Sequence, residues 1–267
     1  MYKLRQFTDD EAIRRVWDVE EIKNLISRYT YFEAGNRREE ALDTLWVSRP
    51  ENTATASFGR NWGFFVGMDN IRRYYLGGNR FGAVGTMTMH PFSTKLLYVA
   101  EDGETAQGLW MGIGYEAAPN GEGKLEGKWV NERMAIDFKR EDGVWKLWHV
   151  FVGTNFTNVA GFPYPELELN TEVREYRDGN PAWYMVGKGR TEMTAEVAKF
   201  DQIIDYPERE AFLAAKPTYT GEIYTALYND QISFPQLPVN YRSFADTTPY
   251  TYEGFRASVS TGEGRTI

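Results

Sequence analysis

The chain has 267 residues, carries a formal charge of -8 and contains no cysteine. Its apolar content of 42% is enough to fill the core of one large domain or two small ones. The absence of cysteine excludes disulfides, thiolate metal sites and cysteine nucleophiles, and the acidic balance, without any run of basic residues, argues against a nucleic-acid partner.

The N-terminal ten residues are charged from Lys3 onward and lack the apolar stretch that a signal peptide needs. No apolar run along the chain reaches the length of a membrane span. We therefore expect a cytoplasmic protein that has no membrane partner.

The predicted helices lie in the first third of the chain. Thr8, followed by three acidic residues, predicts an N-cap and a negatively charged first turn. A long amphipathic helix should follow and end at Gly35, with a second helix at residues 41–46 and a third at residues 68–76, after a β-like stretch at residues 62–66. The apolar residues at helical spacing in the first helix are Ile13, Val16, Trp17, Ile22, Leu25, Ile26, Tyr29 and Phe32.

Residues 84–156 change to a strand pattern, rich in β-branched and aromatic residues. Turn signals at residues 101–103, 119–121 and 141–143 divide this region into long strands of an antiparallel meander. Interior glycines at 108, 112 and 114 predict bends or bulges. Helices packed on such a strongly curved sheet give the α+β class, with a cone-shaped barrel and a cavity on its concave side.

The periodicity fades beyond residue 161, apart from helices expected at residues 194–204 and 208–215. We predict a cone domain over residues 1–160 and a C-terminal extension over residues 161–267. An aromatic, proline-bearing stretch in this extension buries its rings only against another surface, so the extension should wrap the cone domain or a neighbouring subunit. A homodimer or a homotrimer is expected, and the sequence does not choose between them.

Three segments together carry a resemblance to a known family. They read IKNLISRYTYFEAGNRREEALDTLW, MHPFSTKLLYVAEDGETAQGLW and WVNERMAIDFKREDGVWKLWH. In order and spacing they resemble the SnoaL-like branch of the nuclear-transport-factor-two-like superfamily, over about 150 residues. The resemblance implies the cone-shaped fold and pocket positions at Tyr29, His90 and His149. It also shows a departure, because the aspartate that many relatives place five residues after the helix tyrosine is Ala34 here, with Glu33 one position earlier.

Four residues are candidates for catalysis: His90, Tyr29, His149 and Glu33. An imidazole suits acid–base work because its pKa lies near neutrality, and the resemblance places His90 where dehydratases of the superfamily carry their acid–base histidine. A tyrosine could donate to a developing oxyanion. By strand alternation His149 should share a face with Trp145, Leu147 and Phe151 and point to the concave side. The alternatives are a core tyrosine and core histidines whose polar atoms are satisfied locally.

The candidate substrate-binding residues would line the same cavity. Asn131 and Arg133 alternate on one face of a strand and could enter together, where the arginine would fix an anionic oxygen; the alternative is a surface ion pair. Aromatic side chains could flank a flat substrate, although core packing explains them equally well. The full set is Tyr31, Arg60, Trp62, Trp110, Trp129, Asn131 and Arg133.

No cofactor or metal is expected. The two histidines are the only ones in the chain, stand about sixty residues apart and lack HExxH spacing. The chain also lacks a dinucleotide-binding glycine fingerprint, which argues against a flavin, and lacks a cysteine ligand for a haem.

We therefore predict a cofactor-independent lyase, dehydratase or isomerase that uses general acid–base catalysis on a hydrophobic aromatic or polycyclic small molecule. The resemblance further suggests a lyase that releases formaldehyde from lignin-derived diaryl compounds. The alternative is a non-catalytic small-molecule-binding or assembly module of the same fold. An enclosed pocket beside His90 and Tyr29 would favour the enzyme, and complete packing around them would favour the module.

Overall fold

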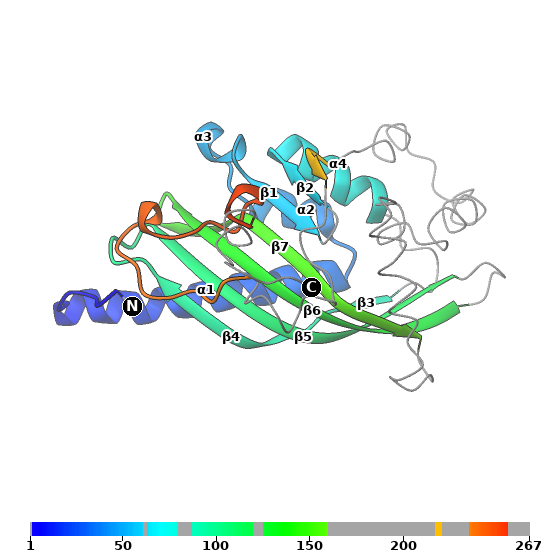
Figure 1. The fold of residues 1–267 in the computed structure, drawn as a ribbon, viewed down its shortest axis with the longest axis horizontal. Coiled ribbons are helices and arrows are strands. Elements are labelled where there is room, and N and C mark those ends of the chain that lie inside the picture. Colours follow the sequence, from blue (N-terminus) through cyan, green and yellow to red (C-terminus); the bar gives the residue numbers. More distant parts are fainter. Residues whose placement is uncertain are drawn as a thin grey trace, which may run out of the picture.

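The computed structural model describes residues 2–60, 63–79, 87–119, 125–159, 217–220 and 235–255. Within these ranges the long helix comes first and the long strands follow, and the helices pack on one face of a curved sheet (Figure 1). The elements are α1 (Asp9–Ala34), α2 (Arg38–Leu45), α3 (Pro50–Thr53), β1 (Ser57–Arg60), β2 (Gly63–Val66), α4 (Met68–Asn79), β3 (Met87–Met89), β4 (Phe92–Val99), β5 (Thr105–Pro119), β6 (Leu125–Glu141), β7 (Val144–Val159), β8 (Tyr219–Thr220) and the 3-10 turn η4 (Phe244–Asp246).

The sheet has the strand order β3-β5-β6-β7-β1-β2-β8, and β4 also pairs with β5. The prediction of an α+β fold is confirmed, and the meander from β4 to β7 is antiparallel as expected. One pair differs from the antiparallel prediction, because β1 runs parallel to β7. Strand β1 has only four residues, too short to display a strand pattern, so its pairing was not visible in the sequence.

Helix α1 begins where the sequence predicts, but its first turns are more exposed than predicted. Thr8 and Glu11 form a capping box, in which each side chain bonds to the backbone of the other residue. Ile22 and Tyr29 are buried on the sheet. In contrast, Ile13, Val16 and Trp17 are 59–68% exposed, so the prediction of a continuous apolar stripe was wrong over the first turns. Those turns extend beyond the edge of the sheet (Figure 1).

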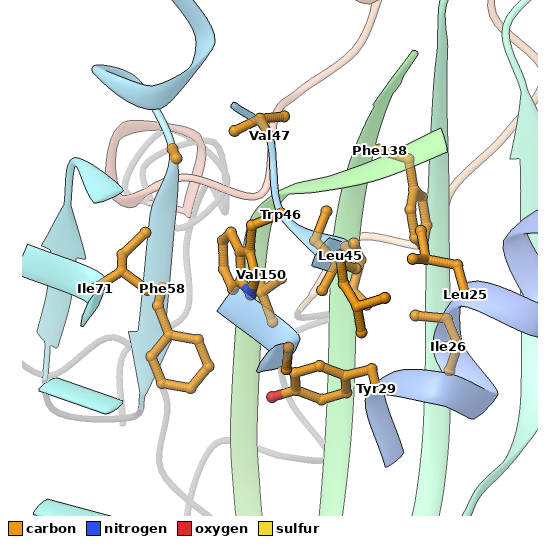
Figure 2. Close-up of a cluster of buried hydrophobic side chains, with 14 of the residues drawn as sticks. Leu25, Ile26, Tyr29, Leu45, Trp46, Val47, Phe58, Ile71, Phe138 and Val150 are labelled. Atoms are coloured by element: carbon orange, nitrogen blue, oxygen red, sulfur yellow. The ribbon is translucent and has the colours of Figure 1, made fainter. Parts of the chain in front are cut away.

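The two faces of the sheet carry separate hydrophobic clusters. The inner face is the side that packs against the helices, and its strand residues Phe138 and Val150 meet Leu25, Ile26 and Leu45 from the helices (Figure 2). The outer face is the opposite side. Its cluster contains Phe64, Leu109, Ala135, Phe151, Tyr250 and Phe255. Because successive strand side chains alternate between faces, the register places each strand residue on the inner or the outer face.

Residues 235–255 lie against the outer face and across the turn between β4 and β5. The backbone N–H groups of Glu101 and Asp102 donate to the carbonyls of Tyr241 and Arg242, each at 3.0 Å. The N–H of Tyr250 donates to Oδ2 of Asp137 at 2.7 Å. The two helices expected within residues 194–215 lie outside the described residues. Among the helices that the structure does describe, none is both long and apolar enough to cross a membrane.

Candidate functional site

A group of polar side chains interrupts the apolar inner face. Three of them lie on the long strands and point inward, because each is an even number of residues from a buried residue of the inner face. They are Glu116 on β5, in phase with Trp110; Glu132 on β6, in phase with Met134; and Thr154 on β7, in phase with Val152. Together with His90 and Arg60 they form what we call the inner polar cluster.

His90 enters the cluster through a break between β3 and β4. Both strands pair with β5, and His90 and Pro91 lie between them, opposite the glycines of β5. A Cβ atom at Gly114 would lie 2.3 Å from Cδ2 of the His90 ring, and one at Gly112 would lie 2.3 Å from the carbonyl oxygen of Pro91. The two glycines therefore allow the histidine ring to lie directly over the strand.

The imidazole of His90 lies between two carboxylates. Its Nδ1 is 3.2 Å from Oε2 of Glu132, and its Nε2 is 3.0 Å from Oε1 of Glu116. Both Nε2 and Oε2 of Glu132 are buried, and neither makes a hydrogen bond of good geometry. Buried polar atoms without hydrogen bonds are unusual in folded proteins, and a catalytic role or a bound water molecule or ion is among their explanations.

Glu132 is held from its other side. Nη2 of Arg60 lies 3.1 Å from Oε1 of Glu132, and the hydroxyl of Thr154 donates to the same oxygen at 2.9 Å. The Glu132 side chain is 3% exposed, whereas that of Glu116 is 40% exposed. The cluster thus has one fixed, buried carboxylate and one carboxylate at the solvent boundary.

The surroundings of His90 favour its charged form. Burial by itself would lower the pKa of the imidazole, but the negative charges of Glu132 and Glu116 outweigh burial, and the pKa of His90 is raised. A raised pKa extends to higher pH the range over which the imidazole carries a proton on both ring nitrogens and can donate one of them.

Tyr29 lies deeper on the same face. Figure 2 shows its ring extending from α1 with the hydroxyl directed away from the helix. That hydroxyl is in a short hydrogen bond with the hydroxyl of Tyr75 from α4. Burial, and to a lesser degree the charge of Glu33, hold the pKa of Tyr29 well above its ordinary value, and burial does the same for Tyr75. Both phenols therefore remain protonated and able to donate.

Glu33 is engaged with Arg38 rather than with His90. Nε of Arg38 donates to Oε2 of Glu33 at 2.8 Å, and both side chains are mostly buried. The carboxylates that face His90 come from β5 and β6 of the sheet, not from α1. The charge of Arg60 acts on both His90 and Tyr29 and offsets part of the rise in the pKa of each, so it links the cluster electrostatically to the tyrosine pair.

His149 lies on the other side of the sheet, and the prediction that it faces the concave side was wrong. The register of β6 and β7 shifts between Asp137 and Phe138, which inserts Trp148 as an extra residue. Beyond this bulge, His149 faces outward with Phe151, while Leu147 remains inside. Nδ1 of His149 is 2.8 Å from Oδ2 of Asp137, and the ring of Phe244 lies 5.9 Å away.

The predicted substrate-binding residues divide between the faces. Asn131 and Arg133 share the register of Ala135 and face outward, as does Trp129, so their prediction as cavity residues was wrong. Tyr31 is 77% exposed on α1, away from the cluster. Arg60 lies in the inner polar cluster, Trp110 is buried on the inner face against Phe138, and Trp62 lies outside the described residues.

Four residues of the inner face escaped prediction from the sequence: Glu116, Glu132, Thr154 and Tyr75. Glu132 did leave a signal, because it continues the alternation of Met134 and Ile136, two apolar residues that face the core. A carboxylate in such a register is costly unless it is paired, and it therefore marks a candidate site. The other three have no such signal in the sequence.

Comparison with known proteins assigns the family. Residues 14–150 match the SnoaL-like domain, which is just over half of the chain. The chain belongs to the SnoaL-like family. No curated protein matches the sequence. The match includes all three segments that carry the resemblance, and it ends before the C-terminal region.

Several solved structures are similar to this SnoaL-like chain. A hexachlorocyclohexane dehydrochlorinase from Novosphingobium barchaimii is 17% identical with a TM-score of 0.44, and the similarity covers 57% of this chain and 97% of that one. A nuclear-transport-factor-two-like protein from Novosphingobium aromaticivorans is 17% identical with a TM-score of 0.42, over 61% and 96%. A protein of unknown function from Mycobacterium tuberculosis is 15% identical with a TM-score of 0.43, over 71% and 94%.

The inner face of this SnoaL-like domain combines the groups that proton-transfer chemistry requires. A charged imidazole can donate a proton, carboxylates can accept one, and two neutral phenols can donate hydrogen bonds to a developing negative charge. In the part of the chain that the structure describes, no three His, Cys, Asp or Glu side chains are grouped as a metal ion would require.

Proposed function

We propose that this protein is a cofactor-independent lyase that acts on a hydrophobic aromatic small molecule, with His90 as its general acid. The observation that carries the proposal is the position of His90, mostly buried on the inner face between Glu132 and Glu116. A core histidine needs one local hydrogen-bond partner, whereas two flanking carboxylates add charge that only an ionised imidazole balances.

The chemistry suited to such a group is protonation of a leaving hydroxyl. Hydroxide is a poor leaving group, and transfer of a proton from Nε2 of His90 would let it depart as water. An aryl ring next to the departing oxygen would share the positive charge that develops on carbon. The inner-face residues next to the cluster along its strands, Met134 on β6 and Val152 on β7, are buried and apolar, and such surroundings suit an aromatic substrate better than a polar one.

The tyrosine pair supports the same proposal. When two phenols share one hydrogen bond, one hydroxyl donates to the other, and the second retains a hydrogen for a further acceptor. We infer that this hydrogen is offered to an oxygen of the substrate. The raised pKa values of Tyr29 and Tyr75 keep both hydroxyls neutral, as a donor of this kind requires.

The proposed substrates are diaryl propanediols of the lignin-derived type, with a benzylic hydroxyl on one carbon and a terminal hydroxymethyl group two carbons away. Protonation of the benzylic hydroxyl releases water. Loss of the proton from the terminal hydroxyl breaks the bond to the terminal carbon, and that electron pair forms the new carbon–carbon double bond. The products are a stilbene-type alkene, formaldehyde and water. The substrate gains one proton, on the benzylic hydroxyl, and loses one, from the terminal hydroxyl.

The test is a turnover assay on purified protein with 1,2-diaryl-propane-1,3-diols, hydroxysteroids and polyketide-like substrates. Released formaldehyde and the ultraviolet absorbance of a conjugated alkene are the readouts. We expect turnover by the wild type, a loss of about 10²–10⁴-fold in kcat for His90→Asn, and a smaller loss for Tyr29→Phe. Exposed Tyr31→Phe is the matched control for the tyrosine and should be unchanged.

Two results would contradict the proposal. Turnover that survives in folded His90→Asn would remove His90 as the acid. An absence of turnover on every substrate, together with saturable binding of one of them, would instead favour a non-catalytic small-molecule-binding module.

A further inference from the structure

The two carboxylates beside His90 differ in burial and in the ring nitrogen that they contact. Glu132 touches Nδ1 of the imidazole, is almost fully buried and has two further partners. Glu116 touches Nε2, and 40% of its side chain is exposed. Such a difference suggests two different tasks.

Glu132 is poorly suited to accept a proton during a reaction. Arg60 and Thr154 are both directed at Oε1, and Oε2 faces the imidazolium. Both oxygens are thus directed at groups of the protein, and the side chain is only 3% exposed, so a substrate hydroxyl has little access to this carboxylate. Glu132 is therefore a positioning residue that fixes Nδ1 of His90 and leaves Nε2 as the reactive nitrogen.

Glu116 has the geometry of a proton acceptor. It points from β5 to the inner face and is partly exposed to solvent there. Its Oε1 lies 3.0 Å from Nε2 of His90. A substrate hydroxyl that approaches Nε2 must also approach this carboxylate. A group at 3.0 Å can receive a proton from the substrate and return it to the imidazole without an intervening water.

We propose that Glu116 is the catalytic base of the same site, which takes the proton from the second hydroxyl of the substrate and returns it to Nε2 of His90. This inference rests on the proposed lyase function. Over one cycle, His90 gives its Nε2 proton to the leaving hydroxyl, which departs as water. Glu116 accepts the proton of the terminal hydroxyl as the carbon–carbon bond breaks and formaldehyde forms. Transfer of that proton from Glu116 to Nε2 restores both groups, so neither an oxidant nor a further acid is consumed.

The experiment compares Glu116→Gln with wild type on the diaryl propanediol that the wild type turns over fastest. We expect kcat to fall by about 10²–10⁴-fold while KM changes by less than about threefold, because glutamine keeps the size of the side chain and loses its basicity. Sodium formate at increasing concentration should restore part of kcat in Glu116→Ala, since the truncated side chain leaves room for a small carboxylate. Glu116→Asp should retain partial activity without formate.

The matched control is Glu51→Gln, which alters an exposed glutamate on α3 and should leave kcat unchanged. Thermal unfolding of each variant separates loss of fold from loss of chemistry. If kcat of folded Glu116→Gln stays within about twofold of wild type while His90→Asn is inactive, the inference is overturned and the lyase function stands. If the wild type itself turns over no substrate, the lyase function fails, and the role of Glu116 fails with it.

Discussion

At the scale of single residues, the backbone beside His90 decides which side chain can reach the inner face. Gly114 of β5 lies under the imidazole, and no larger residue fits there without moving the ring. The sequence displayed the glycines of β5, and their predicted role was to bend the strand. The structure adds a second role, because these glycines also make room for the segment that carries His90.

Gly114→Ala should therefore inactivate the proposed enzyme. The added Cβ would lie 2.3 Å from Cδ2 of His90 and 2.6 Å from the carbonyl oxygen of Met89, so the histidine and its backbone must shift together. We expect a loss of about 1–3 kcal/mol in the free energy of unfolding and a loss of turnover larger than this stability change explains. Urea unfolding and the turnover assay measure the two effects.

Gly143→Ala is the matched control for that substitution. Gly143 has a φ of +79° in the turn between β6 and β7, so alanine is strained there and also destabilises the protein. The turn is far along the strand from His90, and turnover per folded molecule should remain at the wild-type level. Equal loss of turnover in both glycine variants would contradict the role assigned to Gly114.

The pH dependence of turnover tests the charge of His90. An acid with a raised pKa is fully protonated below its ordinary pKa of 6.5 and loses its proton as the pH rises through the raised value, so activity should fall on the alkaline side. Glu132→Gln removes the largest influence that raises this pKa, so that Glu116 alone opposes the lowering by burial and by Arg60. The alkaline limb should move to lower pH, and at a fixed alkaline pH activity should fall about tenfold for each pH unit by which the limb moves.

Thr154→Val provides the comparison for Glu132→Gln. It removes the hydroxyl that donates to Oε1 of Glu132 and keeps both charges. The alkaline limb should move much less than in Glu132→Gln. An unchanged limb in folded Glu132→Gln would mean that the charge of Glu132 does not act on the acid.

At the scale of elements, the C-terminal end of β6 holds the segment that joins α2 to α3. Glu141 at the end of β6 accepts hydrogen bonds from the backbone and hydroxyl of Ser48, from the N–H of Arg49 and from the amide of Asn52. Burial would raise the pKa of Glu141, but these donors outweigh it and the pKa is lowered. A lowered pKa means that the carboxylate stabilises the fold above pH 4.5 and that this contribution is lost as the pH falls through the lowered pKa.

Glu141→Gln should consequently destabilise the protein by about 1–3 kcal/mol at pH 7, because the glutamine amide cannot accept all of these hydrogen bonds. The difference from wild type should shrink as the pH falls below 4.5, where the carboxylate of the wild type is also being protonated. Urea unfolding at a series of pH values measures it. A difference that stays constant with pH would indicate that packing, rather than charge, is responsible.

The elements also show where sequence reasoning succeeds. The N-cap of α1 and the two-residue turn between β6 and β7 have local signals, Thr8 before a run of acidic residues and Asp142 with Gly143, and both were predicted. The bulge at Trp148 has none, because a bulge is defined by the register with a partner strand. Simple alternation therefore placed His149 on the inner face, and one extra residue reversed its side. The exposed start of α1 follows from the extent of the sheet, which is likewise a tertiary property.

At the scale of the whole molecule, the sheet separates two environments. The inner face holds the helices, the tyrosine pair and the inner polar cluster, and the outer face holds residues 235–255. Asp137 is central to the outer arrangement. It accepts from Gln107 at 2.7 Å and from the N–H of Tyr250, and it contacts His149. Gln107 donates in addition to the carbonyl of Thr248 at 3.0 Å, so this network holds the C-terminal segment on the sheet.

The two histidines of the chain should accordingly respond in opposite ways to substitution. His149→Ala removes one partner of a fully buried carboxylate and should lower the free energy of unfolding by about 1.5–3 kcal/mol, with turnover per folded molecule kept, because the imidazole is on the outer face. His90→Ala should abolish turnover at a smaller cost in stability, since His90 is partly exposed and Glu132 keeps Arg60 and Thr154 as partners. Urea unfolding and the turnover assay on both variants give the comparison. Loss of turnover in stable, folded His149→Ala would mean that the outer face contributes to catalysis, which would contradict the separation of the two environments by the sheet.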